Sequence, residues 1–324
     1  MQRLKRFRGN VLDFVAYAVL RMLVATIQCL PYQSGDSLCR MLARLLSGPL
    51  AVRGRLIRQN LERIFPEMPP ATRRRLTYEM WHHLLLMVCE IVWAQRRIHL
   101  SNWRRHATFR NNCAILRNLI SDRPTILVTG HFGNFEIGSY INGLMGFESK
   151  AIARRLDNPY LEKYVHDFRS ATGQHVVDKD GCAAEIDAHL AAGGQLSILA
   201  DQHAGPKGCW EMFMGQIASC HKALALFSIV PDAPMVLVYT IRTGRPMQFQ
   251  FGCTGVVDPL DSPQGYADDV SSLTAWYNRR LEDAVRIAPP QYWWLHNRWR
   301  EPPEKIRKRL AKRQEKERKR SAAA

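Results

Sequence analysis

The stretch that decides the fold is TILVTGHFGNFE, residues 125–136. Its first half is a short apolar run rich in β-branched residues, which predicts a buried strand, and a helix is predicted to follow from about residue 134. His131 and Glu136 lie at this junction with the spacing H-x-x-x-x-E. Because ligands in open α/β sheets bind outside the carboxyl ends of strands, we interpret His131 as a catalytic base and Glu136 as the carboxylate that orients it.

Strands and helices alternate along the rest of the chain. Strand-like runs are predicted near residues 125–130, 149–153, 174–178, 195–200 and 234–242. Helical runs are predicted near residues 134–145, 159–172, 181–192, 216–230 and 269–287. Alternation of this kind indicates an α/β fold with a largely parallel sheet flanked by helices. The first third of the chain is predicted to be helical, with a long amphipathic run from about residue 73 to 95.

Polar side chains follow two further predicted strands. Arg154 and Arg155 lie between a strand end and the start of a helix, where they can reach an anion. Asp201 and Gln202 follow another strand. If the strands are parallel, these residues converge with His131 on one rim of the sheet and are predicted to bind substrate. The structural alternatives are a surface ion pair for Arg154 and capping of the next loop for Asp201.

Composition narrows the choice of partners. The 324 residues are 46% hydrophobic, which allows a sizeable core, and no interior run of Pro, Gly or Ser forms a linker. The 46 Lys and Arg against 29 Asp and Glu give a net charge of +17, which favours phospholipid headgroups, lipid phosphates, an acidic carrier protein or nucleic acid. The eight cysteines form no C-x-x-C pair or zinc-ligand cluster, so no metal site is predicted.

Both ends of the chain are basic. Residues 11–30 are apolar over roughly the length that a spanning helix requires, and four basic residues precede them. One narrow stripe carries the polar members of this segment, Asp13, Tyr17, Arg21 and Gln28. Because basic residues lie on both sides of this segment, the positive-inside rule does not give an orientation for a membrane-spanning helix. A helix that lies partly in one leaflet fits this charge distribution better than a spanning helix. The alternative is a buried core helix of a soluble domain. The charged tail, 301–324, has no aromatic residue for base stacking, so nucleic acid is not an expected partner.

A series of motifs in this chain resembles the lipid A biosynthesis (late) acyltransferases of the lauroyl or myristoyl type, relatives of the lysophospholipid and other glycerolipid acyltransferases. The resemblance spans residues 50–300. Besides the His131/Glu136 box it rests on Asn60-Leu61 with Phe65-Pro66-Glu67, Arg154 before Leu156-Asp157-Asn158-Pro159, Asp201-Gln202, Phe213 with Gly215, and Gln291-Tyr292-Trp293-Trp294-Leu295-His296. The chain departs from the family pattern at Arg155, Met214 and Trp210-Glu211-Met212, which affects acceptor or chain-length preference more than the reaction.

The resemblance implies a glycerolipid-acyltransferase-like fold and O-acyl transfer from acyl carrier protein to a hydroxyl of a lipid A precursor, a step of lipopolysaccharide biosynthesis. No cofactor or protein nucleophile is required, because the acceptor alcohol attacks the thioester once His131 takes its proton. Backbone N–H groups around Phe132–Asn134, or Arg154, are candidates for stabilising the oxyanion, so Asn134 is counted among the substrate-binding residues.

The expected partners are acyl carrier protein, a lipid acceptor with an anionic headgroup, and the cytoplasmic face of the bacterial inner membrane. The expected organisation is a membrane-anchoring helix at 1–30, an acyltransferase domain at 31–300 and a basic tail at 301–324. Two alternatives stay open. The acceptor could be another glycolipid or an amino-acid lipid; in a different class, a non-catalytic basic protein bound to membrane or nucleic acid would make the His131/Glu136 box incidental.

Overall fold

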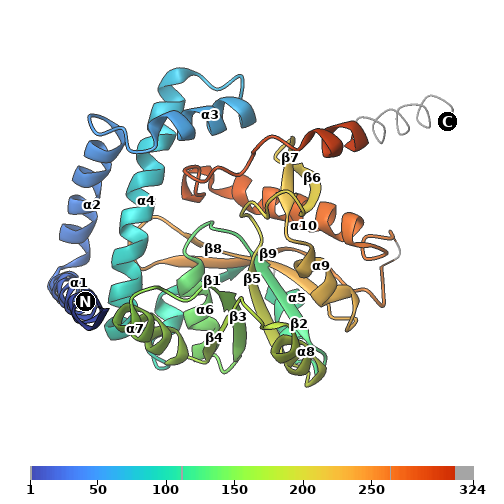
Figure 1. Ribbon diagram of the computed structural model, residues 1–324, viewed down its shortest axis with the longest axis horizontal. Helices are drawn as coiled ribbons and strands as arrows, with labels where there is room; N and C mark the ends of the chain where they lie inside the picture. The colour runs from blue at the N-terminus through green and yellow to red at the C-terminus, as the bar shows by residue number, and fades with distance from the viewer. Residues whose placement is uncertain (1, 111, 263, 311–324) are drawn as a thin grey trace.

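The computed structural model describes the backbone of residues 2–110, 112–262 and 264–310, and the side chains of the same residues except 2–10 and 112 (Figure 1). A seven-stranded sheet with the order β1-β9-β8-β2-β5-β3-β4 forms its centre. Its strands are β1 Ala107–Arg110, β2 Thr125–Thr129, β3 Ser149–Ala153, β4 Gln174–Asp178, β5 Gln195–Leu199, β8 Met235–Arg242 and β9 Phe249–Val257.

Neighbouring strands are parallel throughout this sheet except β8 and β9, which are antiparallel. Helices cover both faces: α5 Asn112–Leu119, α6 Phe135–Leu144, α7 Pro159–Ser170, α8 Ala183–Ala191, α9 Lys222–Ile229 and α10 Val270–Ile287. Side chains of β2 alternate between the two faces, so Ile126 and Val128 join the core beneath α8 to α10, while Leu127 packs with Leu119 of α5. The predicted α/β class with a largely parallel sheet is confirmed.

One predicted helix is partly wrong. Residues 216–220 form a strand, β7 Gln216–Cys220, which pairs antiparallel with β6 Cys209–Phe213; the predicted helix is confirmed only over α9. Met214 and Gly215 form the two-residue connection, and both have positive φ, 55° and 74°. Such a connection matches the right-handed twist of a hairpin, which explains why a strand pair forms here. Strands β1 and β9 were not expected from the sequence either.

The N-terminal region is helical, as predicted, and consists of α1 Gln2–Cys29, α2 Tyr32–Ser47, α3 Gly54–Ile64 and α4 Pro70–Arg97, with two short 3₁₀ turns elsewhere, Trp103–Arg105 and Pro289–Gln291. Helix α4 is the central member and contacts α1, α2, α3 and α6. Figure 1 shows α1, α2, α4 and α7 together at one side of the molecule.

Helix α1 has two unlike faces. Its inner face packs on α4 and α7, where Val24 and Ile27 are buried and the Ile27 carbonyl accepts a hydrogen bond of 2.7 Å from Nε1 of Trp93. Its outward side exposes apolar side chains, which we call the outward arc: Val11, Leu12, Val15, Val19, Met22 and Leu23. The segment Val11–Cys29 is long and apolar enough to cross a membrane. An exposed apolar arc of this size marks a surface that contacts lipid or another protein.

Candidate active site

His131 and Asp201 form the centre of the candidate site. Strands β2 and β5 are neighbours in a register that pairs Thr129 with Leu199, so His131 and Asp201 stand at matching positions two residues beyond the strand ends. Nδ1 of His131 lies 2.8 Å from Oδ1 of Asp201, and the His131 backbone N–H donates to Oδ2 over 3.0 Å. Both side chains are almost fully buried. Gly130 permits this approach, because a Cβ there would lie 3.1 Å from Cγ of Asp201.

The surroundings set the protonation of this pair. Burial opposes charge on His131, but the Asp201 charge and hydrogen bond, together with the Glu136 charge, outweigh it and raise the pKa of His131 above its ordinary value. Burial likewise opposes charge on Asp201, yet the His131 charge and the two bonds to His131 lower the pKa of Asp201. Asp201 is therefore a carboxylate that accepts a hydrogen bond from Nδ1–H of His131, so the lone pair of neutral His131 is on Nε2.

Gln202 lies against that lone pair. Its Nε2 is 3.2 Å from Nε2 of His131. Since Nδ1 donates to Asp201, Nε2 accepts this bond from the amide N–H of Gln202. The buried guanidinium of Arg298 holds the same loop by donating to the Gln202 carbonyl over 3.0 Å and to the Ser219 carbonyl. Gln202 thus covers the basic nitrogen.

Glu136 does not make the orienting contact expected of it. Helix α6 begins at Phe135, and the Glu136 side chain on its first turn points to α7, where Nε of Arg169 donates to Oε2 over 3.2 Å and Nη2 bonds to Oε1. The carboxylate that holds Nδ1 of His131 is Asp201 instead. The influence of Glu136 on His131 is through its charge, which contributes to the raised pKa of His131.

The backbone N–H groups of the 132–134 loop are already bonded. Phe132 donates to the Gly130 carbonyl over 2.7 Å, Gly133 to the Gln291 carbonyl over 3.0 Å, and Asn134 to the Thr240 carbonyl over 2.7 Å. Asn134 is fully buried; its Oδ1 caps α6 by accepting from Ile137. These groups hold the loop in shape, so the predicted oxyanion donors and the predicted substrate contact of Asn134 do not match the geometry.

A buried ionic network fixes this loop from the side of α4. Glu90 is completely buried and receives two bonds from Arg242, of 2.6 and 2.7 Å, and one of 3.0 Å from Nδ2 of Asn134. Arg242 also lies 3.1 Å from Nδ1 of His83, whose Nε2 reaches the Gly133 carbonyl. Burial and the Arg242 charge keep the pKa of His83 well below its ordinary value. Glu90 and Arg242 therefore position the chain that follows His131.

The two predicted arginines lie away from this buried centre. The Arg154 side chain is 70% exposed and pairs with Asp157 over 3.2 Å, and Arg155 pairs with Asp178 over 3.1 Å. Exposed pairs of this kind are weak, so both guanidinium groups are free to exchange their partner for a ligand anion. The structure does not bring them into contact with His131.

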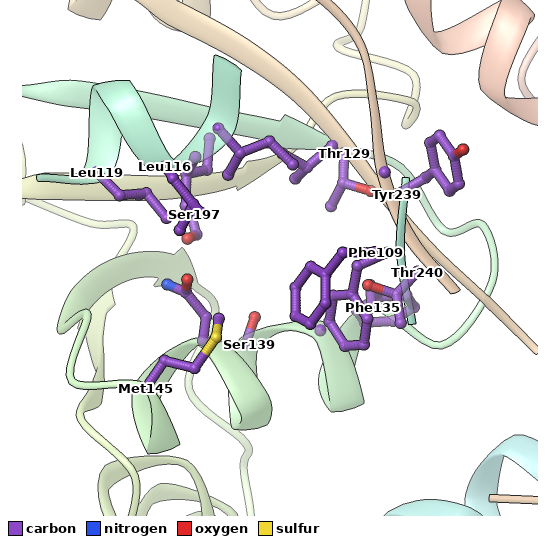
Figure 2. Close-up of a pocket in the computed structure, with 17 residues that line it drawn as sticks. Phe109, Leu116, Leu119, Thr129, Phe135, Ser139, Met145, Ser197, Tyr239 and Thr240 are labelled. Atoms are coloured by element: carbon purple, nitrogen blue, oxygen red, sulfur yellow. The ribbon is translucent and has the colours of Figure 1, made fainter. Parts of the chain in front are cut away.

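A deep apolar pocket lies beside the site, between the sheet and helices α5 and α6 (Figure 2). Thr129, Phe135 and Thr240 line the part nearest His131, and the Phe135 ring lies 5.4 Å from the His131 ring. Leu116 and Leu119 of α5 lie farther in. With open space at its mouth included, the pocket encloses about 740 Å³. Its apolar walls suit a hydrocarbon chain.

Comparison with known proteins identifies the family. The model of the bacterial lipid A biosynthesis acyltransferases matches residues 4–301. This chain belongs to that family. It is 23% identical over 300 residues to the lipid A biosynthesis lauroyltransferase of Escherichia coli (strain K12), which covers 91% of this chain and 93% of the relative.

Two other relatives agree. The lipid A biosynthesis palmitoleoyltransferase of Escherichia coli (strain K12) and the lipid A biosynthesis acyltransferase of Shigella flexneri are each 22% identical over 252 residues, 76% of this chain and 79% of the relative. The protein is thus an acyltransferase of lipid A biosynthesis, within lipopolysaccharide biosynthesis. This confirms the resemblance stated from the motifs and removes the non-catalytic alternative.

The structure of this acyltransferase also shows residues near the site that the sequence did not identify. The Trp293 ring lies 4.5 Å from the His131 ring, and its backbone N–H donates to the His131 carbonyl over 3.1 Å. The sequence also did not identify three charged residues around the site, which come from helices and a strand far apart in the chain: Glu90, Arg169 and Arg242. In the sequence, only the QYWWLH motif pointed to Trp293.

Proposed function

We propose that this acyltransferase moves a fatty acyl chain from acyl carrier protein to a hydroxyl of a lipid A precursor, with His131 as the general base. The observation that carries the proposal is the buried His131–Asp201 pair at the carboxyl end of β2, beside an apolar pocket. A base must lie within hydrogen-bond reach of a substrate hydroxyl, and Nε2 of His131, the ring nitrogen that is not bound to Asp201, is the one that can accept a proton.

The proposed reaction is direct transfer. The acceptor hydroxyl displaces Gln202 from His131, gives its proton to Nε2, and its oxygen bonds to the thioester carbonyl carbon. Asp201 stabilises the imidazolium, as the carboxylate does in a catalytic triad. The tetrahedral intermediate then collapses, the C–S bond breaks, and the leaving thiolate takes the proton back from His131. No protein nucleophile or cofactor takes part.

Glu136 keeps a catalytic role in this proposal, but not as the partner of Nδ1. Its carboxylate adds negative charge near His131 and holds Arg169, which brings a cation to the same rim. We assign Gln202 to the substrate-contacting residues because it covers the basic nitrogen of His131. Arg154 and Arg155 are exposed, and we propose that they bind anionic groups of the acceptor or of the carrier protein.

The acyl chain is proposed to occupy the apolar pocket, with its thioester at the Phe135 end and its methyl end toward Leu119. Burial of each methylene contributes about 0.8 kcal/mol, so a pocket of this kind binds long acyl chains in preference to short ones. The net charge of +17 favours an acidic carrier protein as the donor.

We propose that residues 1–30 attach the enzyme to the cytoplasmic face of the inner membrane, that residues 31–300 form the acyltransferase domain, and that residues 301–324 are an accessory basic tail. Within the tail, residues 304–310 are helical, and residues 311–324 lie outside the described residues. The outward arc of α1 supports attachment along the leaflet surface, because the opposite face is packed on protein. Changing Leu12, Val19 and Met22 to Gln should release the folded enzyme from membranes, whereas full retention would refute the role of the arc.

The central test is transfer of a labelled acyl chain from acyl carrier protein to extracted acceptor lipid. His131→Ala is expected to reduce turnover by about 10²–10⁴, the usual contribution of a general base, while leaving the fold intact. Near-normal turnover by the folded variant would refute the assignment. Mass spectrometry of lipids from a deletion strain tests the acceptor, because the missing acyl chain identifies it.

A further inference from the structure

Two hollows adjoin between helices α1, α4 and α7. The outer one is lined by Arg21 of α1 and encloses about 630 Å³, and the inner one reaches Glu136 and Arg169 and encloses about 520 Å³, open space at the mouths included. Gln95 and Tyr164 line both. Together the hollows form what we call the α1–α4–α7 groove, which runs from the membrane-facing helix to the rim of the candidate site.

The chemistry of this groove changes along its length. At the outer end lie two exposed arginines, Arg21 and Arg96. Arg21 stacks over the Tyr164 ring at 5.3 Å and donates to the Tyr17 hydroxyl over 3.5 Å, and since neither group is an anion its charge stays available. The inner walls are apolar, with Val92 and Phe168 among them. A cationic mouth before an apolar interior is complementary to a lipid with an anionic headgroup.

The position of the groove adds a second argument. Its outer wall is α1, whose outward arc exposes apolar side chains on the other side of the same helix. If that arc lies in the leaflet, the mouth opens at the lipid surface. A lipid that entered from there would avoid exposing its chains to water, which costs about 0.8 kcal/mol for each methylene.

We propose that the α1–α4–α7 groove admits the lipid acceptor sideways from the membrane, and that Arg21 and Arg96 bind its anionic group. The proposal rests on the proposed function, because it assigns a binding path to the acceptor of that reaction. The inner end of the groove is the Glu136–Arg169 ion pair, which also lines the next hollow with Phe135, and the Phe135 ring contacts His131. The acceptor path and the acyl-chain pocket therefore both lead to Phe135, whose ring lies 5.4 Å from the His131 ring.

The first test fills the groove. Ala25 lines its outer end, so Ala25→Trp is expected to raise the KM for a phosphorylated lipid A precursor in mixed micelles about tenfold or more, while the KM for acyl carrier protein thioester stays the same. Ala16→Trp is the matched control, since Ala16 is an exposed alanine on the same helix that lines neither hollow. Vesicle flotation of both variants checks that membrane binding is equal.

The second test removes charge without adding bulk, so it does not depend on whether a tryptophan is tolerated. Arg21→Gln with Arg96→Gln should raise the KM for the phosphorylated acceptor about tenfold, the effect of losing one charge-assisted hydrogen bond, and should have little effect on a dephosphorylated acceptor. Arg44→Gln is the control, because Arg44 is an exposed arginine of α2 outside the groove.

The outcomes separate this proposal from the proposed function. Equal acceptor KM values for Ala25→Trp and Ala16→Trp, with the arginine variant like its control, would overturn the groove while leaving acyl transfer intact. A rise in the donor KM alone would show that the groove takes the acyl donor, which also overturns the proposal. If the unchanged enzyme transfers no acyl chain to the phosphorylated acceptor, the proposed function itself fails.

Discussion

Replacing Asp201 by Asn tests which carboxylate orients the catalytic histidine. The carboxylate accepts two bonds from His131, at Nδ1 and at the backbone N–H. An asparagine has one acceptor oxygen and one donor group, so it cannot accept both bonds. If its oxygen stays on the backbone N–H, its amide N–H faces Nδ1 and forces the imidazole proton to Nε2. The base then presents a proton where it should present a lone pair.

The size of the effect follows from these contacts. A hydrogen bond to a charged group contributes about 1.5–3 kcal/mol, which corresponds to a factor of about 10–150 in the balance of tautomers. Loss of stabilisation of the imidazolium in the transition state adds to this, so kcat for Asp201→Asn should fall by about 10²–10⁴. Asp178→Asn is the matched control, since Asp178 also ends a strand of the sheet but makes no contact with His131; it pairs with exposed Arg155 and accepts from the Asp180 backbone N–H. The kcat of this control should stay near that of the unchanged enzyme.

The pH profile distinguishes Asp201 from Glu136. The base must be neutral, so the rate rises as pH passes through the pKa of His131, which Asp201 and, less strongly, Glu136 raise. Removing the Asp201 charge lowers that pKa and moves the acidic limb of kcat to lower pH. Glu136→Gln should move the acidic limb of kcat less, because the Glu136 charge contributes less than Asp201 to the raised pKa of His131. A larger shift in Glu136→Gln than in Asp201→Asn would refute the assignment of Asp201 and restore Glu136 as the orienting residue.

Three further predictions concern the neighbours of the site. Gln202→Glu places a negative charge beside Nε2 of His131, so it should raise the pKa of the base and move the acidic limb of the kcat profile to higher pH; an unchanged profile would place Gln202 elsewhere in solution. Glu90→Ala leaves the largely buried Arg242 charge without its carboxylate partner and should lower the free energy of unfolding by about 3–5 kcal/mol, measured by chemical denaturation in detergent. Changing Glu90 to Leu and Arg242 to Met together should lower it much less, because no buried charge remains. The control Glu79→Ala, which breaks an exposed pair with Arg75, should lower it hardly at all. Ser197→Leu narrows the acyl pocket and should shift the preference in competition assays to shorter donors, by about fourfold for each methylene excluded; an unchanged preference would mean that the chain binds elsewhere.

The strand and helix pattern was predictable because β2 to β5 and α6 to α8 have the periodicity and punctuation of independent βα units. The apolar run at 125–129 and the helix from Phe135 agree with the sequence within one residue. Strands β1 and β9 were missed because their side chains are buried only by partners distant in sequence: β1 pairs with β9, and β9 pairs antiparallel with β8. Such non-local pairing leaves no local periodic signal.

The partner of His131 could not be chosen from spacing. The H-x-x-x-x-E spacing places Glu136 one helical turn from His131 in sequence, but the direction of its side chain depends on where α7 packs, and there Arg169 binds it. Asp201 is 70 residues away along the chain. It becomes the partner because β5 lies next to β2 in a register that puts positions 131 and 201 side by side. Both residues were predicted to lie on one rim of the sheet, and only the strand order decides which of them contacts the imidazole.

In the proposed attachment, one helix, α1, contributes to the core with one face and binds the membrane surface with the other, which couples attachment to catalysis. Removing residues 1–30 would take Val24 and Ile27 out of the core and leave Nε1 of Trp93 without the Ile27 carbonyl, so loss of activity after such a deletion would not show that membrane binding matters. The two functions lie on opposite faces of α1 and are separable only by changes on one face. Because the inner face is held by α4 and α7, the orientation of the enzyme on the leaflet is set by its core packing. If the outward arc binds the leaflet as proposed, the mouth of the α1–α4–α7 groove keeps a fixed position relative to the lipid surface.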